Sequence, residues 1–130
     1  MPAKRPAAPK PPSKQAILRL VRVWRTRLHL HEWKLGVTVA PIPPEDDASA
    51  WCAAQPQYRS ADLAFDPAII KPDELEATVV HELLHCHVES LAALALDMAG
   101  DDPVKKAQVS RAEEELVTRL ERAFMAAYSG

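Results

Sequence analysis

The first regular pattern in the chain is a row of apolar residues at helical spacing. Ile17, Val21 and Trp24 lie three or four residues apart, and arginines occupy the opposite face. Ser13 stands just before this row and has a side chain suited to capping a helix N-terminus. The sequence therefore predicts an amphipathic helix over residues 14–30.

Apolar and polar residues then alternate, which is typical of β-strands. Trp33, Leu35 and Val37 would share one face of a strand, and Leu63 and Phe65 would share a face of another. A weaker alternation lies between these two segments. Three strands are expected, at residues 33–42, 48–55 and 58–66.

The second half of the chain returns to helical spacing. Asp73 can cap a helix and Glu76 follows three residues later, which is a capping-box arrangement. Gly100 can end that helix, and Pro103 suits the first turn of another. Two further helices are expected, at residues 73–98 and 103–128. The order of helix, three strands and two helices predicts an α+β fold with a small, mainly antiparallel sheet.

Length and composition indicate one domain. The 130 residues suffice for a single core, which we place at residues 14–130. Residues 1–13 are rich in Pro and Lys and are predicted to be a disordered tail. A net charge of −2 argues against nucleic acid as a partner of the whole chain, although the basic tail could contact an acidic partner.

Two cysteines are too few for a disulfide framework. Cys52 and Cys86 are expected to be reduced thiols in a cytoplasmic protein, and a single bridge between them stays open. Neither a secretory signal nor an uninterrupted apolar run of about 18 residues is seen, so no membrane span is expected.

The segment VVHELLH carries the candidate chemistry. His81 and His85 are four residues apart, so they lie about 40° apart on one face of a helix and can reach one metal ion. Neutral imidazole nitrogens are ligands that Zn²⁺ prefers. Glu82 lies about 100° round the helix, where it can take a proton from a water molecule. These residues predict two zinc ligands and one catalytic base.

A catalytic zinc site needs a third protein ligand. No histidine follows His87, and His29 and His31 lie at the end of the first helix. The last two helices should form an antiparallel hairpin that brings the glutamates at 113–115 level with the histidines. Glu113 is at the centre of the predicted apolar face, so we expect it to be the third ligand. Glu114, about 100° away, stays open as the alternative.

The motif His81, Glu82 and His85 resembles the active-site helix of the zincin metallopeptidases. The layout of residues 14–128 resembles a minimal zincin, and EEELVTRLERAF is similar to the closing helix of minigluzincin-like phage and bacterial metallopeptidases. The resemblance implies a Zn²⁺-dependent peptidase with Glu82 as general base. It also implies a peptide or protein substrate that pairs with an edge strand, for which we choose residues 58–66.

Other interpretations remain open at this stage. The chain could be a non-catalytic, metal-binding zincin-like module of phage or prophage origin, or a basic-tailed accessory of nucleic acid. Glu113 could instead form a salt bridge at the edge of the core. Zincins also use a Tyr or His to stabilise the oxyanion, and Tyr58 and Tyr128 are the tyrosines present.

Overall fold

The structure is a computed structural model that describes residues 10–129, and its element order confirms the predicted α+β fold. Residues 1–9 of the expected tail lie outside the described residues. Three short 3₁₀ turns separate some of the longer elements. The helices and strands are α1 (Lys14–Arg27), β1 (Lys34–Val39), β2 (Ala50–Gln55), β3 (Ser60–Phe65), α2 (Leu75–Ala99) and α3 (Pro103–Tyr128).

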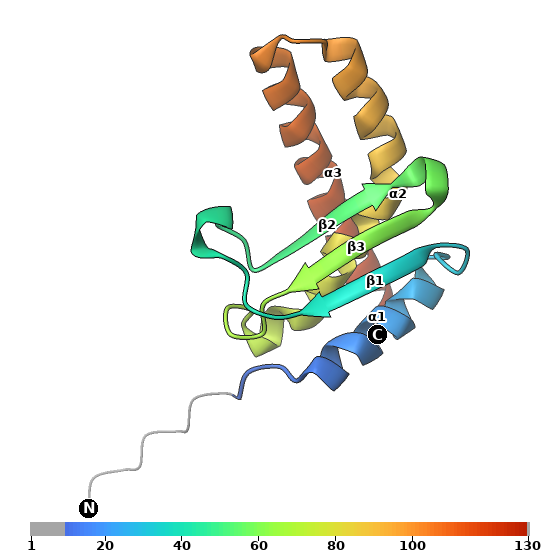
Figure 1. Cartoon of the computed structure of the whole chain (residues 1–130). Coiled ribbons are helices and arrows are strands. Elements are labelled where there is room, and N and C mark those ends of the chain that lie inside the picture. The colour runs from blue at the N-terminus through green and yellow to red at the C-terminus, as the bar shows by residue number, and fades with distance from the viewer. Residues whose placement is uncertain (1–9, 130) are drawn as a thin grey trace, which may run out of the picture.

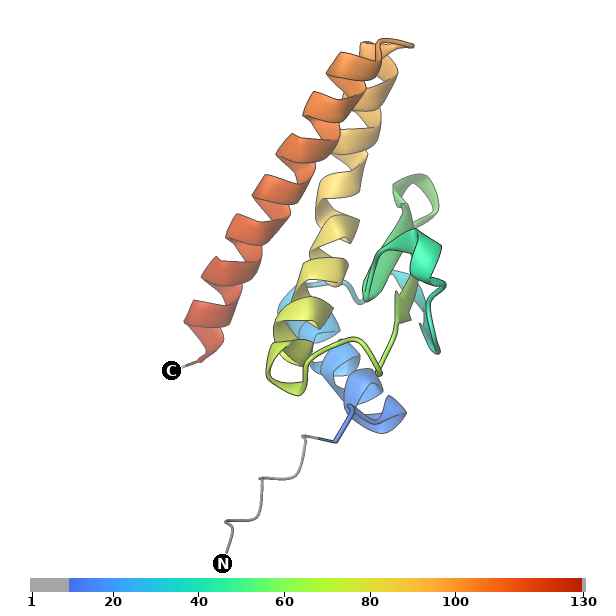
Figure 2. The same cartoon turned by 90° about the vertical axis from the view of Figure 1, so that its left-hand side faces the viewer.

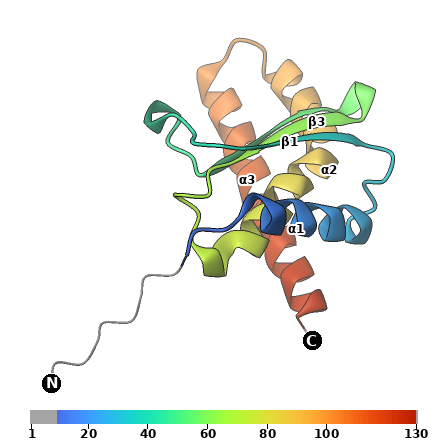
Figure 3. The same cartoon turned by 60° about the horizontal axis from the view of Figure 1, so that its bottom comes forward.

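The three helices lie on one side of the sheet in successive layers. Helices α1 and α2 pack against the strands, and α3 packs against α2 (Figure 1). Figure 2 shows α2 and α3 as a long antiparallel hairpin whose far end extends beyond the sheet. Seen from below, α1 lies across the lower part of the hairpin (Figure 3). The half of α2 that carries the histidines is therefore packed between the sheet, α1 and α3.

One core joins these layers. Trp24 from α1, Phe65 from β3 and Val117 from α3 have no solvent-exposed surface, and Leu83 from α2 is equally buried. The buried faces of α1 and α2 follow from their apolar periodicity. Helix α2 contributes the most buried residues. Packing against the sheet and α1 therefore fixes which side of α2 faces them.

The sheet is mixed, with strand order β1-β3-β2. Strand β3 pairs in parallel with β1 and antiparallel with β2, so the expectation of a mainly antiparallel sheet holds for one of the two pairs. The expected edge strand at residues 58–66 is a wrong prediction, because β3 is the central strand. Its four buried residues explain this place, since a central strand is covered more fully than an edge strand.

The helix ends follow local chemistry, with one exception. The Ser13 side chain accepts a hydrogen bond at the start of α1, as predicted, and Gly100 ends α2 with φ 62°. Asp102 caps α3 just before Pro103. The predicted cap at Asp73 is wrong. The chain forms a 3₁₀ turn over Pro72–Glu74, so Asp73 lies inside that turn and α2 begins without a side-chain cap.

A buried carboxylate holds the loop that leads from the sheet to α2. Asp66 is 3% exposed and accepts hydrogen bonds from the backbone N–H groups of Ile42 at 2.9 Å and Ala68 at 3.0 Å. A buried charge is tolerated only with such partners. Asp66 therefore ties two loops together beside the N-terminal end of α2.

The segment Pro72–Ala99 is long and apolar enough to cross a membrane by length and composition alone, with mean hydropathy 1.2. The core helix of a soluble protein meets the same criterion, and 44% of the relevant window is buried inside this protein. The expected absence of a membrane span stays a prediction.

Candidate metal centre

His81 and His85 project from the face of α2 that borders α3. Their rings lie 5.2 Å apart between centroids and are inclined at 68°. The Nε2 atom of His81 lies 3.1 Å from Oε2 of Glu114, and Nε2 of His85 lies 3.1 Å from Oε1 of the same side chain. The i, i+4 spacing on α2 and one glutamate from α3 thus bring three donor groups together.

The other ring nitrogens are held by two more glutamates of α3. Nδ1 of His81 lies 3.0 Å from Oε1 of Glu121, and Nδ1 of His85 lies 3.0 Å from Oε1 of Glu113. When each Nδ1–H donates to its carboxylate, the Nε2 lone pair points toward Glu114. Metal-binding histidines usually have such a partner, which fixes the tautomer and the ring orientation.

The structure places Glu113, the expected third ligand, beside the other ring nitrogen of His85. Its side chain faces inward as predicted and is only 14% exposed, but it contacts Nδ1 of His85 rather than joining the Nε2 atoms. Glu114, which is 59% exposed, forms the three-residue group with His81 and His85. The donors meet at the solvent rim of the α2–α3 interface. Glu114 lies on the flank of α3 and reaches that rim, whereas Glu113 lies at the centre of the buried face and does not.

Glu82 lies about 100° round α2 from His81, on the side of the helix that faces the sheet. It is 8% exposed, and burial raises its pKa, although the nearby charges of His85 and His81 lower it. A carboxylate with a raised pKa beside a metal-binding group can accept a proton near neutral pH. The role of Glu82 as a catalytic base stays a prediction.

Strand β2 is the sheet edge that lies closest to this side of α2. The neighbouring thiol of the buried Cys86 of α2, together with burial, raises the pKa of the Cys52 thiol of β2. The charge of Glu82 also acts on both thiols. Both cysteines are free, as expected, and Glu82 lies close enough to the two histidines and to both thiols for its charge to act on them.

The remaining histidines lie elsewhere. His87 Nε2 is 2.6 Å from the backbone O of Leu28, so this ring joins α2 to the end of α1. His29 and His31 are exposed in the turn after α1. None of the three belongs to the group of His81, His85 and Glu114.

The two tyrosines do not line the hollows beside the histidines. Tyr58 is 72% exposed in the turn between β2 and β3, and the Tyr128 ring packs edge-on against Trp24 at 5.2 Å. The candidate oxyanion role therefore has no tyrosine placed for it in the described residues.

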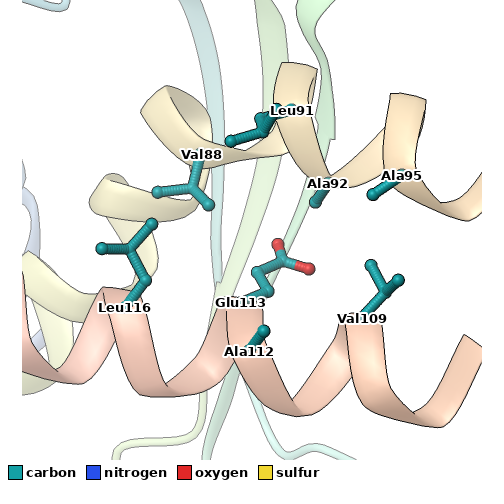
Figure 4. Close-up of a pocket in the computed structure, with 8 residues that line it drawn as sticks. All are labelled: Val88, Leu91, Ala92, Ala95, Val109, Ala112, Glu113 and Leu116. Carbon is teal, nitrogen blue, oxygen red and sulfur yellow. The ribbon is translucent and has the colours of Figure 1, made fainter. Parts of the chain in front are cut away.

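Glu113 also lines an apolar groove of about 180 Å³ between α2 and α3. Figure 4 shows its carboxylate pointing from α3 toward α2 among aliphatic side chains. Burial, a hydrogen bond with Glu113 and the charge on Glu113 raise the pKa of Glu89 to about 7. Glu89 therefore lies close to Glu113.

The donor set fits zinc. Two imidazole nitrogens and one carboxylate oxygen lie within 4.8 Å of one another. Two ligands of a tetrahedral zinc are about 3.3 Å apart when each is about 2.0–2.1 Å from the ion. This is close to the 3.1 Å that separates each Nε2 from one of the two carboxylate oxygens of Glu114. Three protein ligands would leave a fourth position open, as in catalytic zinc sites.

The chain matches no protein-family profile, no curated protein and no solved structure significantly.

Proposed function

We propose that this protein is a zinc-dependent peptidase of the zincin type. His81, His85 and Glu114 would hold the metal, and Glu82 would be the general base. The observation that carries the proposal is the convergence of both Nε2 atoms on one carboxylate, each at 3.1 Å, with the buried Glu82 next to them. A purely structural zinc site would have no need of Glu82.

The residues divide the chemical work. When bound, Zn²⁺ polarises the scissile carbonyl and lowers the pKa of a water molecule. Glu82 accepts the proton from that water and later delivers it to the leaving amine. Glu113 and Glu121 keep the two imidazoles in the tautomer whose Nε2 lone pairs face Glu114.

The substrate would bind along β2 rather than along β3, the strand expected to form the edge. Strand β2 pairs with β3 on one side only, which leaves the other side free for an extended peptide. Strand β2 packs against α2, and its Cys52 lies close enough to Glu82 to feel its charge, so the free edge runs near the base. Peptide backbone paired with β2 would therefore pass near the proposed metal position.

Hydrolysis of a mixed peptide library, followed by mass spectrometry, tests this function. Zinc-loaded protein should cleave peptides, and removal of the metal by a chelator should stop cleavage. Glu82→Gln should keep about one zinc per chain and lose about 10²–10⁴-fold in rate, since it removes proton transfer but not ligation. Loss of zinc in this variant would show that Glu82 is a ligand and would contradict the mechanism.

A second function remains for the same residues, namely a metal-binding module that does not hydrolyse peptides. The positions of Tyr58 and Tyr128 favour it, because neither lines a hollow beside the histidines. A wild-type protein that binds one zinc and cleaves nothing in the library would favour this alternative.

A further inference from the structure

We propose that the flank of α3 beside Glu114 binds a carboxylate of the substrate, so that peptides with a negative charge near the cleaved bond are preferred. This inference rests on the proposed function for its substrate, a peptide. Arg111 and Arg122 are the residues that would contact the carboxylate, and Thr118 lies between them.

Helical spacing places these residues on the side of α3 that carries Glu114. Arg111 is three residues before Glu114, and Thr118 and Arg122 are four and eight residues after it. All four line a shallow groove of about 310 Å³ on α3. Since Glu114 also contacts both Nε2 atoms, the groove begins at the proposed metal position.

The groove is positively charged. It contains Arg111, Arg119 and Arg122 against Glu115, which leaves two positive charges when Glu114 is assigned to the metal (3 − 1 = 2). Within residues 10–129, no ion pair of 4.0 Å or less joins these three arginines to a carboxylate. Their guanidinium groups can therefore pair with a ligand.

The hollow on the other side of His81 has the opposite character. It has a volume of about 360 Å³ and is lined by Glu74 and Glu121, with no basic side chain except His81. A carboxylate is repelled there and attracted to the flank of α3. The surface beside the histidines is thus negative at the hollow lined by Glu74 and Glu121 and positive at the groove on the flank of α3.

The geometry also limits the position of the charge on the substrate. Arg111 lies about 4.5 Å and Arg122 about 12 Å from Glu114 along the helix axis, at 1.5 Å per residue. An extended peptide spans about 3.3 Å per residue, so the carboxylate should lie within about four residues of the cleaved bond. Guanidinium groups suit it because they can donate two parallel hydrogen bonds to a carboxylate.

Binding rather than turnover gives the direct test. Three acetylated hexapeptides of alanine are titrated by NMR into zinc-loaded Glu82→Gln protein: one with a free C-terminal carboxylate, one with a C-terminal amide, and the amide with one alanine replaced by glutamate. Either acidic peptide should bind about three- to tenfold more tightly than the neutral amide, because the groove is exposed. The two acidic peptides distinguish a terminal from a side-chain carboxylate.

The arginines are then replaced. Combining Arg111→Gln with Arg122→Gln should remove the preference without changing zinc content, and Arg22→Gln on the exposed face of α1 should keep it. A preference that survives the double change, an equal loss in the Arg22 variant, or no binding of any peptide at millimolar concentration would overturn the proposal. A wild-type protein that binds no zinc but still prefers the acidic peptides would contradict the peptidase function and leave the carboxylate site standing.

Discussion

Glu114 and His85 come from different helices, yet Oε1 of Glu114 lies 3.1 Å from Nε2 of His85. The hairpin of α2 and α3 makes this contact, and Figure 2 shows the two helices side by side along their length. Because Glu113 holds the opposite nitrogen of the same ring, adjacent glutamates have different places around one histidine. Substitutions of Glu113 and of Glu114 should therefore change zinc binding by different amounts.

We expect Glu114→Ala to weaken zinc binding more than about a hundredfold, since it removes a ligand and therefore costs more than the 10–100-fold typical of an outer partner. Competition with a coloured zinc chelator measures the change. Glu115→Ala is the matched control, because that exposed side chain is not part of the donor group and should leave the affinity nearly unchanged. Equal affinity in the two variants would remove Glu114 from the metal centre.

Glu113→Gln and Glu121→Gln should each weaken zinc binding about 10–100-fold, because each loses the charged acceptor of a histidine Nδ1–H. The same chelator competition applies. Should Glu113→Gln cost far more than Glu114→Gln, the ligand predicted from the sequence would be the right one and the structural assignment wrong.

Zinc should stabilise the fold, because its ligands come from two helices and are not preorganised in the unfolded chain. With free zinc at about 100 times the dissociation constant, linkage gives about 2.7 kcal/mol. That corresponds to a rise in melting temperature on the order of 10 °C for a domain of this size. Calorimetry with zinc and with excess chelator measures the shift, and an unchanged melting temperature together with negligible metal content would contradict both metal-dependent functions.

Asp66→Ala should lower the free energy of unfolding by about 3 kcal/mol, because the buried N–H of Ile42 and the part-buried N–H of Ala68 lose a charged acceptor. Asp73→Ala provides the comparison, since this exposed residue makes no cap on α2 and should change stability by less than about 0.5 kcal/mol. Urea unfolding of both variants measures the difference. A larger loss at Asp73 than at Asp66 would restore the capping role that the sequence suggested.

The sequence alone determined the features that depend on neighbours along the chain. Periodicity located all three helices to within a few residues, because a helix places residues three and four apart on one face. The same rule set His81 and His85 side by side and turned Glu82 away from them. The Ser13 cap was predictable for the same reason, since its bond spans a single turn of helix.

Only the tertiary structure decided the features that depend on segments far apart in the chain. Alternation of apolar residues shows that β3 is a strand but does not show which strands pair with it, and pairing with β1 and β2 on its two sides made it central. Helical periodicity limited the third donor to the glutamates at positions 113–115. The choice among them depended on how α3 crosses α2, because the Nε2 atoms meet a carboxylate at the rim of that interface and not at its buried centre.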